Sequence, residues 1–389
     1  MAPHLSKGGA VAPLSYAAPH DRQGKPASTS AVDVGTPGYA QRVQSLTRAG
    51  ETELATLSSS FRTALTTIEP SSVDKVNAPL AHASVRTTLT NADTLQAWGL
   101  SPVLIGSYKR DVSIRRVKDV DVFCRMESID SDVSGSEVLD AFFDVLDSEY
   151  GRDSDGSRRV RRQARSLQVA FPEYDGLYVD AVPARPRQDG YWEIPSKDSD
   201  EWQSTNPEQL TQLKTDMNAA TGELYVPTVK LLRQARRTVL NSRPGGLFVE
   251  LALYDACTKG LVQFDDQALA FVTGLEAVAS YLQDKIRWGR ELPDPTMDGH
   301  SASFRATDVQ WVNARDRFVK AAENARAAYV EDDAGIAALA YRGLLGESGD
   351  GVTVFPMPAG YDEDGTRKAL SAPITAGERM VPAGDRRFG

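Results

Sequence analysis

The sequence has few of the residues that build disulfide frameworks and metal-ligand clusters. Its 389 residues include only two cysteines, Cys124 and Cys257, and four histidines. Two cysteines cannot form a disulfide framework or a four-cysteine zinc site, and the histidines show no metal-ligand spacing. No run approaches the roughly 18 apolar residues of a membrane span, and the N-terminus lacks the apolar stretch of a signal peptide. We therefore expect a soluble, cytoplasmic protein that does not bind membranes.

The chain also has fewer basic than acidic residues. The chain carries 44 basic and 53 acidic residues, which gives a net charge of -9. This balance excludes a generically polycationic nucleic-acid coat, because the chain as a whole would repel phosphate. Any contact with a nucleotide must come from a local basic cluster. Hydrophobic residues make up 41% of the chain, which is ample for a core, and the length predicts two to three structural units.

The two ends of the chain differ in composition from its middle. Residues 1–38 are rich in Ala, Pro, Ser and Gly and predict a disordered segment. Residues 347–389 carry Gly, Pro and charged residues and predict a flexible tail, in which 352–355 is the one candidate docking strand. Between these ends we expect a mixed first part over 39–215 and a helical lobe over 216–346.

Helical and extended patterns alternate in the first part. Helices are expected over 39–67, 72–98 and 138–146. Strands are expected over 103–105, 120–123, 167–171 and 177–182. Ser134 and Glu137 have the spacing of a capping box, and Asn206 followed by Pro207 predicts a helix start, after which the chain is expected to be helical to about 345. The folded body is therefore of the α+β class.

The segment that carries chemistry begins at Gly106 and reads GSYKRDVSIRRVKDVDV. On a strand, Asp119 and Asp121 would point one way, while Val120 and Val122 would point into the core. Two carboxylates on one face repel each other unless a cation lies between them, and such oxygen ligands suit Mg²⁺. For an Asp-x-Asp pair alone, a solvent-facing acidic strand is the plainer interpretation.

Two neighbouring features favour a catalytic interpretation. Gly106 and Ser107 directly follow a buried strand and suit a phosphate-binding turn, with several basic residues close by in the same loop. Downstream, the apolar strand 177–182 carries one carboxylate, Asp180, which is costly there unless it is paired or metal-bound. If this strand lies beside the first, three carboxylates could hold two metal ions for a phosphoryl displacement.

These spacings resemble a known family. Gly-Ser, eleven residues, Asp-Val-Asp and then Val-Asp-x-Val-Pro resemble the nucleotidyltransferases of the polymerase-β superfamily. More narrowly they resemble the bacterial CD-NTases, relatives of cyclic GMP-AMP synthase and oligoadenylate synthase. The resemblance covers about 40–345 and implies a bilobed enzyme. Its polymerase-β-like nucleotidyltransferase core with N-terminal helices would span 39–215, and its helical C-terminal lobe 216–346.

The resemblance also implies roles for the motif residues. Gly106 and Ser107 would bind the triphosphate of a substrate NTP. Asp119 and Asp121 would ligate two metal ions, Mg²⁺ or Mn²⁺. Asp180 would ligate the metal nearer the attacking hydroxyl and accept its proton.

In the second lobe, the family's basic phosphate contact would fall at Lys230 or Arg233, and the spacing does not choose between them. One departure is visible. Several relatives have a Ser–aromatic pair that stacks on the nucleobase, whereas this chain has Gly246 and Leu247, with Phe248 one residue later. The densest basic cluster, 158–165, is interpreted as a solvated edge strand or turn, with a phosphate-binding or activator surface as the alternative.

The implied function is template-independent synthesis of a cyclic di- or trinucleotide from NTPs, with ATP as the expected substrate. In bacteria, this resemblance implies an antiphage second messenger that acts on a downstream effector. The alternatives are a linear oligonucleotide synthase, a tRNA-type nucleotidyltransferase and an inactive nucleotide sensor. The acidic net charge argues against binding of tRNA, and the three carboxylates argue against a sensor.

The C-terminus suggests a second partner. The chain ends Arg-Arg-Phe-Gly at Gly389. Many CD-NTases of this kind are encoded beside an E1/E2-like ligase that conjugates their C-terminal glycine to targets. The alternative is an ordinary unstructured end.

Overall fold

The computed structural model of the chain describes three ranges of residues: 57–196, 201–240 and 242–369. The expected disordered segment 1–38 and the terminal Gly389 lie outside these ranges. The helix expected over 39–67 lies partly outside them, and its described portion is helical over 57–68.

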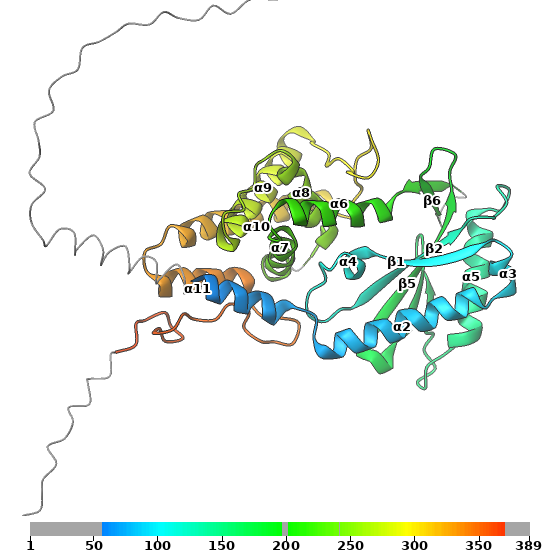
Figure 1. Cartoon of the computed structure of the whole chain (residues 1–389), viewed down its shortest axis with the longest axis horizontal. Coiled ribbons are helices and arrows are strands. Elements are labelled where there is room, and N and C mark those ends of the chain that lie inside the picture. Colours follow the sequence, from blue (N-terminus) through cyan, green and yellow to red (C-terminus); the bar gives the residue numbers. More distant parts are fainter. Residues whose placement is uncertain (1–56, 197–200, 241, 370–389) are drawn as a thin grey trace, which may run out of the picture. The chain divides into compact units, whose positions relative to one another are not determined.

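A mixed sheet organises the first half of the described chain (Figure 1). Among the described residues it has seven strands: β1 (Leu100–Ile105), β2 (Asp119–Met126), β3 (Val160–Arg162), β4 (Leu167–Phe171), β5 (Leu177–Pro186), β6 (Trp192–Pro195) and β7 (Trp202–Thr205). Five of them follow the order β1-β2-β5-β4-β3, in which β2 and β5 are parallel and the other neighbours are antiparallel. The two strands that carry the motif aspartates are therefore direct neighbours. The hairpin of β6 and β7, which extends from β5, was not expected from the sequence.

Two helices cover one face of this sheet. These are α2 (Ser72–Thr90) and α5 (Gly135–Tyr150), and their apolar sides share a core with Val120, Val122 and Val179. Because side chains alternate along a strand, the residues between these valines point to the opposite face. The expected inward direction of Val120 and Val122 is thus confirmed.

The ends of these two helices follow from their capping residues. Ser134 and Glu137 form the predicted capping box before α5. Ser71 and Asp74 form another before α2. The prediction that the second helix runs to residue 98 is wrong, because the helix ends at Thr90 and a separate turn, α3 (Asp93–Gln96), follows it.

The second half is helical, as predicted. Its helices are α6 (Pro207–Ala220), α7 (Tyr225–Val239), α8 (Gly246–Thr258), α9 (Gln267–Trp288), α10 (Asp308–Tyr329) and α11 (Ala334–Leu345). Asn206 caps α6 through its side chain, with Pro207 at the first helical position, as expected. Much of α7 is buried by its neighbours, including Lys230 and Gln234. This helix forms the centre of the second core.

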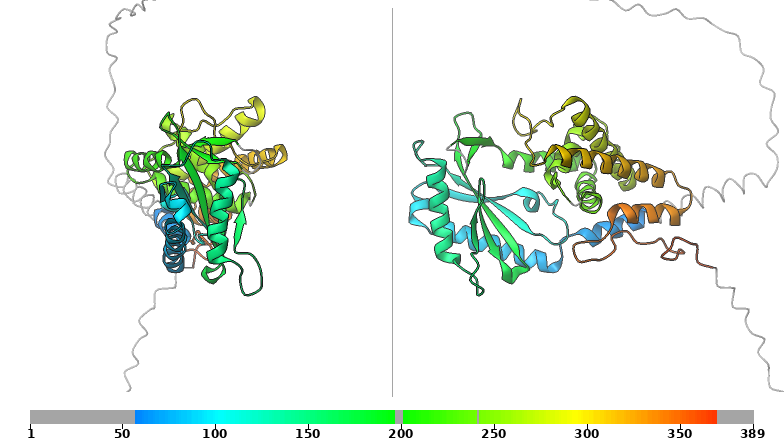
Figure 2. Two further views of the ribbon diagram at one scale, coloured as in Figure 1. Left: turned by 90° about the vertical axis from the view of Figure 1, so that its right-hand side faces the viewer. Right: turned by 180° about the vertical axis from the view of Figure 1, so that it is seen from behind.

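The helix 57–68 packs with the second half, although it precedes the sheet in sequence. Figure 2 shows it beside α11 in the view from behind. The ring of Phe61 meets Tyr341 of α11 edge-on, with 4.9 Å between ring centroids, and Phe355 at 5.0 Å. The chain therefore begins its described part in the helical core before it enters the sheet.

The prediction of a flexible tail is wrong for residues 347–369. Val354 and Phe355 are fully buried, and Phe355 completes the aromatic contact with Phe61 and Tyr341. The expected docking strand 352–355 is not a strand, since only an isolated bridge pairs Thr353 with Glu347. These two side chains help to anchor the segment, because their burial removes apolar surface from water.

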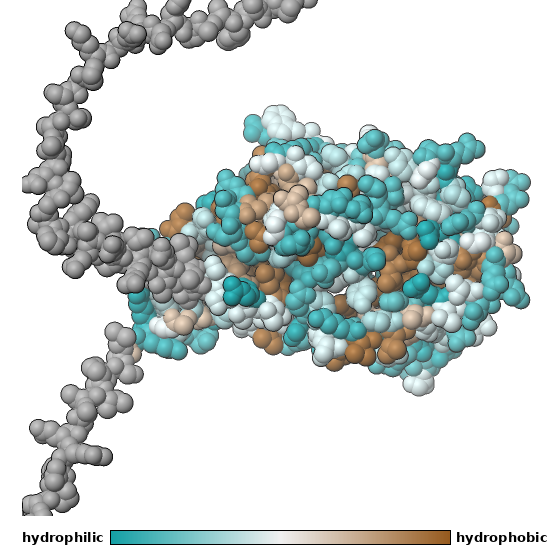
Figure 3. Space-filling model, viewed as in Figure 1, coloured by the Kyte–Doolittle hydropathy of each residue, from teal (hydrophilic) through white to brown (hydrophobic). Residues whose placement is uncertain are grey.

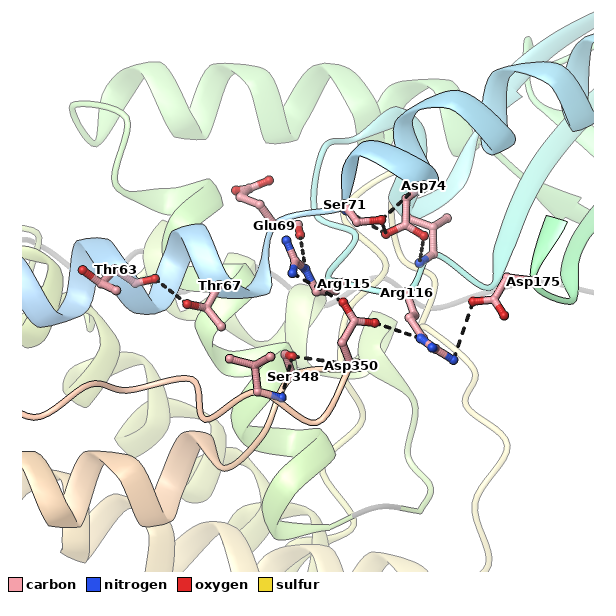
Figure 4. Close-up of polar contacts among 12 residues, drawn as sticks. Thr63, Thr67, Glu69, Ser71, Asp74, Arg115, Arg116, Asp175, Ser348 and Asp350 are labelled. Atoms are coloured by element: carbon pink, nitrogen blue, oxygen red, sulfur yellow. Dashed lines mark hydrogen bonds and ion pairs between the residues drawn. The ribbon is translucent and has the colours of Figure 1, made fainter. Parts of the chain in front are cut away.

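The same segment contacts the loop that leads into β2 (Figure 4). The Asp350 carboxylate accepts hydrogen bonds from Nη1 of Arg115 at 3.4 Å and from Nε of Arg116 at 2.9 Å. The Arg115 amide donates to the carbonyl of Ile68, and its Nε donates to the carbonyl of Glu69. The loop between Ser107 and Asp119 is thus held from two sides by segments distant in sequence.

None of the described helices is long and apolar enough to cross a membrane. Hydrophilic residues cover much of the face drawn in Figure 3, with smaller apolar patches among them. On α2, three apolar residues are more than half exposed: Val73, Val76 and Leu80.

Candidate active site

Three carboxylates come together on the open face of the sheet. In the parallel pairing of β2 with β5, Asp121 lies directly opposite Asp180, and Asp119 lies two residues earlier on β2. All three alternate with valines that point toward α2 and α5. They therefore share the face that these helices leave uncovered, which is the arrangement that the Asp-x-Asp spacing predicts.

The electrostatics of these groups favour a cation between them. Burial, and then the charges of Asp119 and Asp180, raise the pKa of Asp121 to about 7. Burial and the charge of Asp119 also raise the pKa of Asp180 to about 6. Such shifts mean that the ionised carboxylates destabilise one another, and a bound cation would relieve this repulsion.

Gly106 lies directly against this cluster. It follows β1 at the start of the single turn α4 (Gly106–Lys109) and has a φ of 75°. A Cβ on this residue would overlap the Asp121 carboxylate, with Cγ only 2.7 Å away. Glycine is therefore required at position 106 for two reasons: the positive φ, and the close approach of the Asp121 carboxylate to its Cα.

Gly106→Ala is expected to lower turnover by at least about a hundredfold, because the added methyl group displaces the Asp121 carboxylate from its position. Part of the cost will appear as a loss of stability of about 1 kcal/mol or more from the strained φ. Steady-state pyrophosphate release and thermal unfolding measure the two effects. Gly156→Ala, at a positive φ with open space around it, is the control for backbone strain alone, and equal turnover in the two variants would contradict the steric argument.

Ser107 lies next to Gly106 on the wall of the same cavity. Its hydroxyl is 3.1 Å from that of Ser113, so the loop that follows α4 folds back onto it. When Ser113 is the donor in this contact, the Ser107 hydroxyl is free to donate to an anion in the cavity.

A buried ion pair joins the two halves of the molecule behind this turn. Nε of Arg110 donates to Oε1 of Glu250 at 2.7 Å, and Nη2 donates to Oε2 at 3.1 Å. Glu250 on α8 is 1% exposed, and Nη1 of Arg233 on α7 approaches its Oε2 at 3.8 Å. Arg110 and Arg233 both line the cavity, so a single carboxylate orients two guanidinium groups near the aspartates.

The structure places the two basic candidates of α7 differently. Arg233 lines the cavity and lies against Gly246, where a Cβ would be 2.9 Å from its Cζ. Lys230 does not line the cavity as described. Its Nζ donates to Glu69 at 2.7 Å and to Asp111 at 3.2 Å. Arg233 is therefore the basic residue of this helix that could contact a phosphate.

The cavity itself measures about 940 Å³ and is lined by both halves. The sheet contributes Asp119 and Asp121, together with the hairpin of β6 and β7. The helical half contributes the start of α8 and the segment 294–304. Asp180 is not among the described residues that line the cavity, although it is the strand partner of Asp121.

Comparisons with known proteins agree with this geometry. Residues 55–218 match the family model described as the Second Messenger Oligonucleotide or Dinucleotide Synthetase domain, SMODS. A cyclic AMP-AMP-AMP synthase of an Acinetobacter species is 25% identical over 350 residues, which cover 84% of this chain and 95% of that protein. Residues 55–218 are thus matched as a Second Messenger Oligonucleotide or Dinucleotide Synthetase domain, and the chain as a whole resembles CD-NTases in sequence and fold.

Solved CD-NTases share the fold. Escherichia coli CdnC with ATP aligns with a TM-score of 0.58 at 18% identity, covering 77% of this chain and 98% of that one. Bradyrhizobium diazoefficiens CdnG with GTP also gives a TM-score of 0.58, at 16% identity, with 74% and 94% covered. The expected α+β, bilobed polymerase-β-like architecture with a helical lobe, and the family resemblance itself, are confirmed.

The aromatic residues that line the cavity were not predicted from the sequence. Phe248 is fully buried in a cluster with Tyr281, Phe304 and Trp311 and does not reach the cavity. Trp202 of β7 and Phe304 line it instead. No signal in the sequence predicted these two rings, because their positions depend on how the hairpin and the segment 294–304 fold over the site.

The donor set limits how a metal could bind. Within the described ranges, no three His, Cys, Asp or Glu side chains are gathered tightly enough to hold an ion by themselves. Mg²⁺ commonly uses one or two carboxylates and takes its other ligands from water and substrate phosphates. Asp119 and Asp121, which lie beside the turn of Gly106 and Ser107, fit that mode of binding.

Proposed function

We propose that this CD-NTase joins NTPs, ATP among them, into a cyclic di- or trinucleotide that serves as a second messenger in antiphage defence. The site of synthesis would be the cytoplasm, and the product would act on a downstream effector. The observation that carries the chemistry is the pairing of Asp121 with Asp180, with Asp119 on the same face and Gly106 against Asp121. The likeness to a cyclic AMP-AMP-AMP synthase over most of the chain supports a cyclic product.

The reaction assigned to this site is a nucleotidyl transfer. A ribose hydroxyl of one nucleotide attacks the α-phosphorus of another, a P–O bond forms, the bond to the β-phosphate breaks, and pyrophosphate leaves. Ser107 and Arg233 would bind the triphosphate, and Asp180 would take the proton of the attacking hydroxyl. Mg²⁺ or Mn²⁺, held by Asp119, Asp121 and Asp180 together with water and the substrate phosphates, would stabilise negative charge on the phosphoryl oxygens. Attack by the last free hydroxyl on the first α-phosphate closes the ring.

Product analysis tests this proposal. The protein is incubated with labelled NTPs and Mg²⁺ or Mn²⁺, treated with phosphatase and examined by mass spectrometry. Phosphatase-resistant cyclic products are expected. Linear products would instead indicate an oligonucleotide synthase, label incorporated into added tRNA would indicate a tRNA-type transferase, and absence of turnover under all conditions would indicate a sensor.

Arg233 and Lys230 give a matched pair of variants on one helix. Arg233→Gln is expected to raise the KM for NTP about tenfold or more, because it removes a charged hydrogen-bond donor from the cavity. Lys230→Met should leave the KM within about twofold, because Lys230 contacts Glu69 and Asp111 rather than the cavity. Steady-state kinetics measure both KM values. A raised KM in the Lys230 variant alone would assign the phosphate contact to Lys230 instead of Arg233.

Conjugation of Gly389 by an E1/E2-like ligase is also proposed, on the evidence of the Arg-Arg-Phe-Gly ending. A terminal residue without a side chain can reach a catalytic cysteine. The ligase would first activate the Gly389 carboxylate with ATP as an acyl adenylate, releasing pyrophosphate. The cysteine thiol would then displace AMP to form a thioester, and a target amine would displace the thiol to form an amide. Co-expression with a neighbouring ligase should give adducts of higher mass that vanish on deletion of Gly389. Adducts that persist after the deletion would refute the proposal, and basal synthesis should not change.

A further inference from the structure

Arg165 and Arg305 come from different halves of the molecule, and of the two only Arg165 is among the described residues that line the cavity. Arg165 belongs to the turn between β3 and β4 and lines the cavity. Arg305 directly follows Phe304, the last residue of the cavity-lining segment 294–304. Both side chains are exposed to solvent.

Neither arginine has a carboxylate partner in the part of the chain that the structure describes. Other arginines of the same hairpin do, since Arg159 pairs with Glu173 and Arg162 with Asp140. Partial burial and the nearby charge of Arg305 lower the pKa of Arg165. Two like charges that approach each other without a counter-ion form a favourable site for an anion, and guanidinium groups suit phosphate in particular.

The position of Arg165 indicates which phosphate this would be. The turn is held by the Gln163 amide, which donates to the carbonyl of Ser166 at 2.8 Å. The Gln163 side chain donates to Oδ1 of Asp180 at 3.3 Å, so Arg165 lies on the Asp180 side of the carboxylates. In the order β1-β2-β5-β4-β3, Ser107 belongs to the other side, next to β1.

We propose that Arg165 and Arg305 bind the 5′-phosphates of the acceptor, first the nucleotide that supplies the attacking hydroxyl and then the growing oligonucleotide. This inference rests on the proposed function, and it assigns the acceptor to the part of the cavity that the donor triphosphate does not occupy. The donor triphosphate would lie at Ser107 and Arg233, and the acceptor phosphates would lie across Asp180 from it. The basic cluster of the hairpin would thereby contribute one phosphate contact through a residue at its turn.

Acceptors that differ only at their 5′ end test the inference. ATP is the donor, and the acceptor is either the linear dinucleotide pppApA or ApA with a free 5′-hydroxyl. The wild-type enzyme should extend pppApA with the lower KM. Arg165→Gln and Arg305→Gln should each raise the KM for pppApA about tenfold and leave the rate with ApA unchanged, and Arg165→Lys should restore part of the loss.

Arg161→Gln is the matched control, because Arg161 lies exposed on β3 of the same hairpin and is not among the described residues that line the cavity. It should retain the wild-type preference for pppApA. Variants at Arg165 and Arg305 that keep this preference overturn the inference and leave the proposed function intact. A wild-type enzyme that neither extends nor cyclises pppApA, and that releases no pyrophosphate from ATP alone, overturns the proposed function and the inference with it.

Discussion

Asp121→Asn is expected to reduce synthesis by more than about a thousandfold while the fold is retained. Asp121 lies at the centre of the site, opposite Asp180 and against Gly106, and lines the cavity. The amide has nearly the same shape as the carboxylate but no charge, so it fits the space and is a poor ligand for a divalent cation. Phosphoryl transfer depends almost wholly on positioning and electrostatic stabilisation, and here that stabilisation is lost. Pyrophosphate release measures the effect.

The same substitution should stabilise the metal-free protein. Because the pKa of Asp121 is raised to about 7 in the fold, the ionised form is the one that folding disfavours, and its cost is fully present at pH 8. Without that charge, the free energy of unfolding in EDTA at pH 8 should rise by about 1 kcal/mol or more. Asp144→Asn, at an exposed position of α5, is the control and should change neither property. Wild-type turnover in Asp121→Asn would refute the site assignment.

Strand periodicity was enough to predict which face carries Asp119 and Asp121, because the direction of a side chain follows from its position in the strand. Asp119 and Asp121 lie where the alternation with Val120 and Val122 places them. Asp180 lies directly opposite Asp121 because β2 and β5 pair in parallel. The order of residues within each strand does not determine which strands pair. The sequence offered this pairing only as a hypothesis.

The choice between Lys230 and Arg233 illustrates what spacing cannot predict. Both residues are basic and lie on the same helix, one turn apart. In the packed helix α7, the Lys230 side chain points toward Glu69. The Arg233 guanidinium lies against α8, where Gly246 has no side chain to obstruct it. These partners are distant in sequence, so tertiary packing determines which of the two basic residues reaches the cavity.

The segment 347–369 was misjudged for a related reason. Its composition is that of a loop, and local pattern therefore predicts flexibility. Its order comes from Val354 and Phe355, which enter a core that Phe61 and Tyr341 supply from far away in the chain. Gln234 adds two hydrogen bonds to the carbonyls of Leu345 and Glu347.

Glu250→Ala should be the most destabilising single change in this region, with a loss of about 3–5 kcal/mol. It leaves Arg110, which is 4% exposed, buried without its carboxylate, and it removes the nearest carboxylate of Arg233. Glu250→Gln should cost less, because the amide oxygen still accepts one hydrogen bond. Urea denaturation followed by circular dichroism measures these differences, and a loss below about 1 kcal/mol for Glu250→Ala would contradict the buried ion pair.

A double substitution separates the structural from the catalytic role of this pair. In Arg110→Met/Glu250→Leu, both charges are replaced by apolar groups of similar volume, which is often neutral for stability or better. We therefore expect the double variant to recover most of the stability that Glu250→Ala loses. Turnover should stay at least about tenfold below wild type, because Arg110 lines the cavity near Gly106 and Ser107 and its positive charge is gone. Recovery of turnover together with stability would mean that the pair serves only to join the two halves of the molecule.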